Sequence, residues 1–324
     1  MFNFSRRVVV LFLSLSAAAA MPATAQTPAL IKLVVPYPPG GSVDTMARLL
    51  AQPLSDELKT SVVVDNRPGA GGRIAASQLK RDTADGSVIL IAPNALTTIQ
   101  SLTYAGKIDY SVTRDFTPVS RLASYPFGVA VPTNSPAKSV PDLLKAMKAN
   151  PSVASYGTSG AGGMAHFAAI ALGKEAGVDW THVAFKGGAP LVTDLIGGHI
   201  PVGVDTLVDQ IEHQRGGKIR ILGIFSPHRY ALAPEIPTLA EQGLKVAPVE
   251  GWFGAFVPAR TPKETVARID AAIAKVIQEK DFKARLNKLM LEPSYLPSQE
   301  FTKLQVAELQ QWEPVVKASG FTPD

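Results

Sequence analysis

The chain has 324 residues, 46% hydrophobic and 18% charged, with a net charge of +5, which excludes a disordered or collagen-like chain. It contains no cysteine, and this excludes disulfides, thiolate metal sites, iron–sulfur clusters, a catalytic cysteine and a lipid-modified N-terminal cysteine. A single core rarely grows beyond about 250–300 residues, so the length indicates about two domains.

Residues 1–25 have the features of a signal peptide. Arg6 and Arg7 precede the apolar run Val8–Ala20, and residues 23–25 read A-T-A, a cleavage pattern that predicts a mature chain starting at Gln26. The run is shorter than the roughly 20 residues of a membrane span, and no later apolar stretch is long enough. We therefore expect an exported, periplasmic protein without an anchor. The sequence leaves Sec and twin-arginine export open.

Cleavage at this position removes two of the 32 basic residues and none of the 27 acidic ones, which leaves a net charge of +3. The basic residues are spread along the chain, with no run interleaved with aromatic residues, so we expect no nucleic-acid partner. A mild positive charge is compatible with an anionic ligand.

After the leader, short Val- and Ile-rich segments alternate with helical patterns, which predicts an α/β fold with mostly parallel sheets. Strands are expected at Ile31–Val35, Val62–Asp65, Val88–Ala92, Phe127–Val131, Val153–Tyr156, His182–Phe185, Val202–Asp205, Ile219–Phe225 and Trp252–Val257. The main helices are expected at Asp44–Leu58, Pro141–Ala149, Gly163–Glu175, from Thr261 to about Glu279, and from about Gln299 to Ala318.

Several local signals mark the ends of these helices. Ser139 is a predicted N-cap, Gly177 and Gly320 are predicted stops, and residues 261–264 (TPKE) match a capping box. Pro53 is expected to kink or split the first helix.

No repeat or low-complexity linker separates the two expected cores. We therefore predict that short crossing strands join them, at Ser120–Phe127 and Pro248–Phe253. This places residues 26–125 and 252–324 in lobe 1, with the C-terminal helices, and residues 126–251 in lobe 2.

Four segments repeat one plan, in which a strand is followed by a Gly-rich turn and a helix. They are residues 38–42, 67–72, 157–163 and 186–190. Glycine lets backbone N–H groups approach a ligand, and the start of the next helix adds unpaired donors and a positive dipole end. Turns of this kind at the carboxyl ends of strands predict a carboxylate or phosphate site. The alternative is that they are only tight connections.

Nucleotide-binding motifs are absent, since the chain has neither a Walker loop nor a dinucleotide fingerprint. Residues 157–161 (GTSGA) resemble a nucleophile elbow, except that Ala161 replaces the second glycine, so a secreted α/β hydrolase remains the alternative function. The five histidines lack the spacing of a helical metal site, and we expect no metal and no cofactor.

Three polar residues near the turns have two interpretations each. His166 either donates to a ligand oxygen or is a satisfied core histidine. Asp205 either faces the ligand cleft or caps the helix near Leu207–Glu212. Lys186 either neutralises an anion or points to solvent.

The turns lie in motifs that resemble the Bug-type, TctC-like solute-binding proteins, the extracytoplasmic receptors of tripartite tricarboxylate transporters. The matching motifs are residues 35–44 (VPYPPGGSVD), 47–48 (AR), 66–72 (NRPGAGG), 185–190 (FKGGAP), 235–241 (EIPTLAE), 251–252 (GW) and 256–259 (FVPA). The likeness covers nearly the whole mature chain in the same order.

The resemblance implies a two-lobed Venus-flytrap fold of type II-like topology, with a ligand cleft between the lobes and no enzymatic activity. The implied ligand is a di- or tricarboxylate, an aromatic carboxylate or an acidic amino acid, and the implied partners are membrane transporter subunits; a ligand-sensing receptor for a signalling partner is a further alternative. We expect a monomer. The predicted ligand-binding residues are Tyr37, Pro39, Gly40, Gly41, Ser42, Asp44, Thr158, Ser159, Gly160, Ala161, Gly162, His166, Lys186, Gly187, Gly188, Ala189 and Asp205. In this resemblance Ser42, Thr158 and Ser159 add hydroxyl donors, and Asp205 is an orienting residue.

Overall fold

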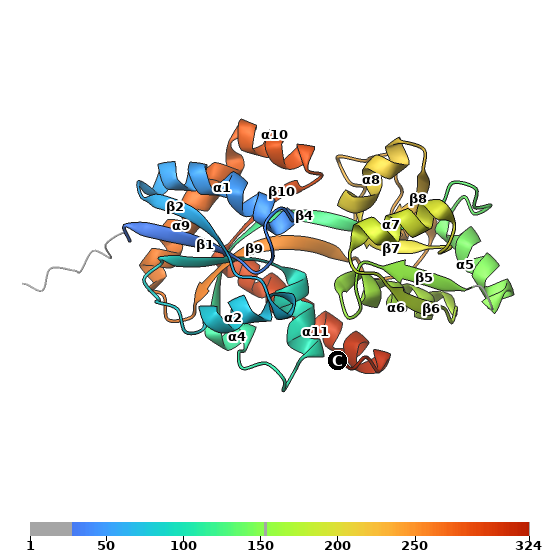
Figure 1. The fold of residues 1–324 in the computed structure, drawn as a ribbon, viewed down its shortest axis with the longest axis horizontal. Coiled ribbons are helices and arrows are strands. Elements are labelled where there is room, and N and C mark those ends of the chain that lie inside the picture. Colours follow the sequence, from blue (N-terminus) through green and yellow to red (C-terminus); the bar gives the residue numbers. More distant parts are fainter. Residues whose placement is uncertain (1–27, 152–153, 324) are drawn as a thin grey trace, which may run out of the picture.

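The computed structural model describes residues 28–151 and 154–323, which form two lobes joined by long strands (Figure 1). The predicted leader and its cleavage site lie outside the described residues. The strands are β1 (Leu30–Val35), β2 (Ser61–Asn66), β3 (Val88–Pro93), β4 (Phe116–Pro132), β5 (Ser155–Thr158), β6 (Thr181–Ala184), β7 (Gly203–Thr206), β8 (Ile219–Ile224), β9 (Glu250–Pro258) and β10 (Glu292–Pro297).

Helices cover the sheets of both lobes (Figure 1). They are α1 (Ser42–Leu58), α2 (Arg73–Leu79), α3 (Gln100–Thr103), α4 (Val112–Asp115), α5 (Val140–Ala149), α6 (Met164–Ala176), α7 (Gly188–Gly197), α8 (Leu207–Arg215), α9 (Lys263–Gln278), α10 (Lys280–Lys288) and α11 (Ser298–Ser319). Short helical turns occur at Ala70–Gly72, Ala95–Ile99 and Ala240–Gln242.

The sheet of lobe 1 has the order β2-β1-β3-β9-β4, with β10 also paired to β4. Its first three strands are parallel, whereas β9 runs antiparallel to both β3 and β4. Every residue of β3 is buried, as expected for an apolar run at the centre of a sheet covered on both faces.

The sheet of lobe 2 has the order β4-β7-β5-β6, and β8 pairs with the same part of β4. Strand β5 is parallel to β6 and β7, while β4 runs antiparallel to β7 and β8. The two-lobed α/β fold is thus confirmed. The sheets are mixed rather than mostly parallel, because both long strands that join the lobes run antiparallel to their neighbours.

Strand β4 belongs to both lobes. Its residues 116–126 pair with β9, and from Phe127 onward it pairs with β7 and β8. The change of partner occurs between Pro126, opposite Glu250, and Phe127, opposite Thr206. Both predicted crossing segments therefore overlap strands that connect the lobes, and the residue boundaries of the lobes stay a prediction.

Most of the predicted helix ends are confirmed. The Ser139 hydroxyl accepts from the Asp142 N–H at 3.1 Å, and Gly177 and Gly320 end α6 and α11 in left-handed conformations. The predicted capping box at residues 261–264 is wrong, because Pro262 occupies the N-cap position of α9 and the Thr261 hydroxyl has no partner among the described residues.

Two further differences concern lobe 1. Helix α1 continues through Pro53 without splitting; a proline removes one helical N–H, and tertiary packing of the apolar face, including Leu50 and Leu54, holds both sides in place. Strand β10 and helix α10 were not predicted, and β10 has the unusual composition EPSYLP, with two prolines, at the edge beside β4.

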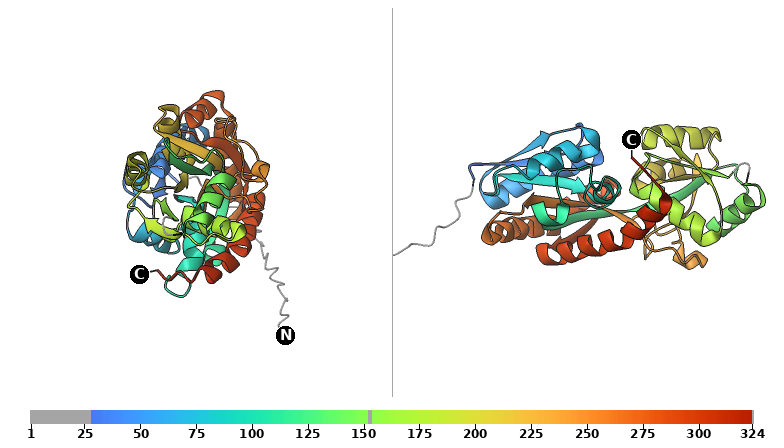
Figure 2. Two further views of the ribbon diagram at one scale, coloured as in Figure 1. Left: turned by 90° about the vertical axis from the view of Figure 1, so that its right-hand side faces the viewer. Right: turned by 90° about the horizontal axis from the view of Figure 1, so that it is seen from below.

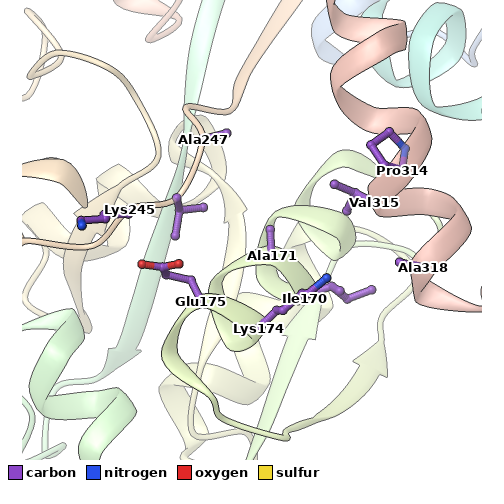
Figure 3. Close-up of a pocket in the computed structure, with 10 residues that line it drawn as sticks. Ile170, Ala171, Lys174, Glu175, Lys245, Ala247, Pro314, Val315 and Ala318 are labelled. Atoms are coloured by element: carbon purple, nitrogen blue, oxygen red, sulfur yellow. The ribbon is translucent and has the colours of Figure 1, made fainter.

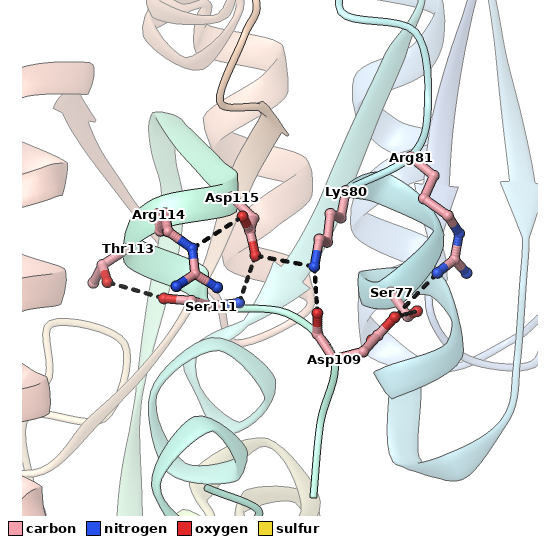
Figure 4. Close-up of polar contacts among 8 residues, drawn as sticks. All are labelled: Ser77, Lys80, Arg81, Asp109, Ser111, Thr113, Arg114 and Asp115. Carbon is pink, nitrogen blue, oxygen red and sulfur yellow. Dashed lines mark hydrogen bonds and ion pairs between the residues drawn. The ribbon is translucent and has the colours of Figure 1, made fainter. Parts of the chain in front are cut away.

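A polar cluster ties α2 to the loop before α4 (Figure 4). Asp109 accepts from the Ser77 hydroxyl at 2.9 Å and pairs with Arg81 at 3.0 Å, and Lys80 lies 3.8 Å from Asp115. Hydrogen bonding, chiefly from Ser77, lowers the pKa of Asp109. Because the side chains of Arg81 and Asp109 are largely exposed, their ion pair adds little to stability.

Candidate ligand-binding site

The turn between β1 and α1 is shaped by Asp44, whose side chain is buried. One carboxylate oxygen accepts from the Gly40 N–H at 2.9 Å and from Arg48 Nε at 2.8 Å, and the other accepts from Asn66 Nδ2 at 2.9 Å. These bonds, chiefly the one from Arg48, lower the pKa of Asp44 to about 2. The Asp44 carboxylate is therefore used inside the chain, where it holds Gly40 at a φ of 94°.

The next two residues of this turn face outward. Gly41 has an ordinary φ of −79°, and a Cβ at this position would meet no atom of residues 28–151 and 154–323 within 4 Å. Ser42 begins α1, whose N-cap residue is Gly41, and a glycine has no side chain that could cap the helix. The first amides of this 17-residue helix are consequently left for another acceptor. Tyr37, at the start of the turn, packs against the core and accepts from Asn66 Nδ2 through its carbonyl at 3.1 Å.

The turn after β5 is held by its own hydroxyl groups. Thr158 Oγ1 donates to the Gly160 carbonyl at 2.7 Å, so the 2.8 Å bond between Thr158 Oγ1 and His182 Nε2 has the imidazole as donor. Ser159 Oγ donates to Asp205 Oδ1 at 2.8 Å. Both hydroxyl protons that the resemblance offers to a ligand are thus placed on protein acceptors, and the turn's remaining donors are backbone amides ahead of α6.

Asp205 lies at the end of β7 and is fully buried. Its Oδ1 accepts from Ser159, whereas Oδ2 has no hydrogen-bond partner among the described residues. Burial, with a smaller contribution from the charge of Asp209, raises the pKa of Asp205 to about 7. The N-cap of α8 is Thr206, which accepts from the Asp209 N–H, so the capping interpretation of Asp205 is wrong.

His166 is buried in the first turn of α6. Its Nδ1 accepts from the Gly162 N–H at 3.0 Å, and its ring stacks on His182 with centroids 3.8 Å apart. Burial, and then the neighbouring His182, lowers the pKa of His166 to about 4, which keeps Nδ1 free to accept. The interpretation as a satisfied core histidine therefore holds for this nitrogen. His182 was not predicted as a site residue, and no motif or spacing in the sequence distinguishes it from other strand residues.

The turn at residues 186–190 lies beside the turn that follows β5. The Gly187 N–H donates to the Ser159 carbonyl at 3.0 Å, and a Cβ on Gly188 would lie 2.6 Å from Asp209 Oδ2. Position 187 requires glycine because its φ is 111°. Position 188 requires glycine because a side chain there would collide with Asp209. Lys186 and Ala189 are exposed, as are Pro39 and Ala161 at the other turns.

A small pocket of about 80 Å³ joins the two lobes. It is lined by Ser42, Tyr125, Thr206, Val208, Asp209, Phe253 and Leu291. Ser42 belongs to the first turn of lobe 1, and Thr206, Val208 and Asp209 to the start of α8 in lobe 2. Tyr125 and Phe253, whose ring centroids are 5.1 Å apart, come from the strands that join the lobes.

Sequence reasoning identified only Ser42 of these lining residues. Tyr125 and Phe253 fall in the two predicted crossing segments, and no sequence signal marked them as residues that line a pocket. Larger pockets of about 520 and 650 Å³ lie between α6 and α11 and beside α9, and neither contains a residue of the glycine turns. Among the described residues no group of His, Asp and Glu could hold a metal ion, and no helix could span a membrane.

Comparison with known proteins identifies the family of this chain. Residues 46–321 match the receptor family of the tripartite tricarboxylate transporters. The chain belongs to this family. Its members are solute-binding proteins, so the receptor is not an enzyme and the hydrolase alternative is discarded.

Individual relatives resemble the receptor over most of their length. Protein BugT from Bordetella pertussis is 30% identical over 321 residues, 98% of each chain. The structure of Rpa4515 from R. palustris with adipate has 32% identity and a TM-score of 0.80, and covers 91% of this chain and 98% of that one. MatC from Rhodopseudomonas palustris with bound malate has 27% identity and a TM-score of 0.75, with 89% and 98% covered.

Proposed function

We propose that this receptor captures a small carboxylate between its lobes and delivers it to the membrane subunits of a tripartite tricarboxylate-type transporter. The observation that carries the proposal is the interlobe pocket, where Ser42 at the uncapped start of α1 meets Thr206 and Asp209 of the other lobe above an aromatic floor. A ligand there would touch both lobes at once.

Backbone amides supply the anion-binding chemistry in this proposal. Helices α1 and α6 both follow a Gly-rich turn, and the N-cap residue of each is a glycine, which has no side chain to cap the helix. Unpaired amides and the positive end of the dipole at such a helix start stabilise a carboxylate without a charged side chain. The hydroxyls of Thr158 and Ser159 contribute indirectly, by holding the turn whose amides face the ligand.

Aliphatic dicarboxylates are the first candidates, since the related structures hold adipate and malate. A thermal-shift panel with adipate, malate, citrate, glutamate and benzoate tests the proposal. A ligand at 100 times its Kd stabilises the folded state by about 2.7 kcal/mol, a readily measured shift. We expect at least one carboxylate to bind one-to-one by calorimetry and to be recovered chemically unchanged. A panel in which no carboxylate moves the melting temperature contradicts the proposal.

We further propose that binding closes the lobes about the point where β4 changes partner, with lobe 1 made of residues 26–125 and 252–324 and lobe 2 of residues 126–251. A ligand favours the closed form because the open form offers the donors of only one lobe. Small-angle scattering should give a smaller radius of gyration with ligand, at an unchanged monomeric mass. An open apo protein whose scattering curve is unaffected by saturating ligand refutes closure.

A further inference from the structure

The C-terminal end of the chain reaches from lobe 1 to lobe 2. Helix α11 packs on β4 and β10 of lobe 1, and its last turns contact α6 of lobe 2. Figure 3 shows Pro314, Val315 and Ala318 of α11 across a groove from Ile170 and Ala171 of α6. The end of α11 lies between the lobes in Figure 1 and in the right-hand view of Figure 2. This end is a third connection, separate from the joining strands.

Phe321 forms the tip of this connection. Gly320 ends α11 with a φ of 66°, and the Phe321 N–H donates to Ser319 Oγ at 3.1 Å. The Phe321 ring meets His166 and Phe167 edge-on, with centroids 5.8 and 5.9 Å away.

The same segment is also tied back to lobe 1. The Pro323 carbonyl accepts a hydrogen bond of 3.0 Å from Nζ of Lys107, a residue that follows α3. The chain end is therefore held by lobe 1 while its aromatic ring rests on lobe 2, and a change in the angle between the lobes must move that ring relative to α6.

Phe321 touches the turn that precedes α6 at its most constrained point. Gly162 is buried with a φ of 67°, and its N–H is committed to His166 Nδ1. A Cβ on Gly162 would lie 2.5 Å from Phe321 Cζ, so the ring rests directly on the backbone there. By contrast, a Cβ on Gly160 or Gly163 would meet no atom within 4 Å in the described part of the chain. One wall of the turn is thus supplied by the other lobe.

We propose that Phe321 is a positioning residue for ligand binding, which braces the 160–163 turn from lobe 1 and couples the shape of that turn to the angle between the lobes. The proposal rests on the proposed carboxylate-binding function of this turn. Phe321 does not line the interlobe pocket, and it acts through Gly162 and His166. Removing the ring frees the turn, so the amides ahead of α6 lose their fixed direction before the ligand arrives.

The test compares Phe321→Ala with Phe321→Tyr and with the matched control Val315→Ala, which trims the α11–α6 groove without touching the turn. Hydrogen–deuterium exchange on the ligand-free proteins measures directly how firmly the 160–163 turn is held. In Phe321→Ala we expect peptides covering residues 160–167 to exchange at least tenfold faster, and β1 and α1 to stay unchanged. Phe321→Tyr should restore the wild-type rate, and Val315→Ala should keep it. If Phe321→Ala does not fold, Phe321→Leu, which keeps bulk but loses the ring edge, takes its place.

Binding is measured by calorimetry with adipate, malate and benzoate. Against a wild type that binds one of them, Phe321→Ala should bind about tenfold more weakly and Phe321→Tyr nearly normally. Unchanged exchange at residues 160–167, or unchanged affinity beside a binding wild type, overturns the brace and leaves the proposed function intact. A wild type that binds none of the three counts against the proposed function, and the exchange rates then decide the brace alone.

Discussion

Replacing Asp205 by Asn tests the electrostatics of the buried site. Asn keeps an oxygen that accepts from Ser159 and resembles the protonated acid in shape. The pKa of Asp205 is raised from 3.8 to about 7, and a shift of one unit corresponds to about 1.36 kcal/mol. Between about pH 4 and 7 the folded chain therefore keeps a proton that the unfolded chain has lost. Stability falls as the pH rises through this window.

The full shift corresponds to about 4 kcal/mol of wild-type stability lost across the window, at no more than about 1.4 kcal/mol per pH unit. Urea unfolding of both proteins at half-unit steps from pH 4.5 to 8 measures it. Between these limits, we expect the free energy of unfolding of the Asn variant to rise by about 3 kcal/mol or more relative to that of the wild type. This difference in stability should level off above pH 7.

The difference in stability between the two proteins cancels the effects of all other titrating groups, because these act equally in both. Burial likewise raises the pKa of Glu308 to about 7 in lobe 1, where its carboxylate accepts from Trp252 Nε1 at 2.7 Å. Glu308→Gln, as a matched control, should abolish its own share of the slope and leave that of Asp205 in place. A wild-type-minus-Asn difference that varies by less than about 1 kcal/mol over the whole range refutes the raised pKa of Asp205.

Three other predictions concern packing, the ligand and processing. Gly251→Ala should destabilise the fold by about 2–3 kcal/mol in urea unfolding, because the new Cβ would lie 2.0 Å from the Tyr125 ring. The control Gly41→Ala, whose Cβ has open space among the described residues, should lie within about 0.5 kcal/mol of wild type, and equal losses of stability in the two variants would contradict the contact between Gly251 and Tyr125. Gly41→Val should fold yet weaken carboxylate binding by calorimetry at least tenfold more than Lys186→Ala, and unchanged affinity would discard the assignment of this turn to the site. Mature protein from an exporting bacterium should begin near Gln26 without lipid, and an intact mass that includes the leader would contradict export.

Local signals in the sequence predicted the alternation of strands and helices well. The N-cap Ser139 and the stop residues Gly177 and Gly320 lie where the structure has them, because each acts on backbone groups within a few residues. The predicted N-cap at Thr261 was wrong, since Pro262 occupies the cap position instead. The Gly-rich turns were also identified from sequence, and the turns at residues 38–42 and 186–190 lie at the interlobe pocket or beside Asp209, which lines it.

By itself, the sequence determined the order of most elements up to α9, the glycine turns and the family, because periodicity, turn chemistry and motifs are properties of residues close together in the chain. Tertiary structure alone decided what each polar group does. The Ser159 hydroxyl looked free for a ligand until folding brought it to Asp205, 46 positions away, and Phe321 meets Gly162 only because α11 crosses to the other lobe. A hydrogen bond or a ring contact depends on distance in space, and the spacing of residues along the chain does not contain that distance.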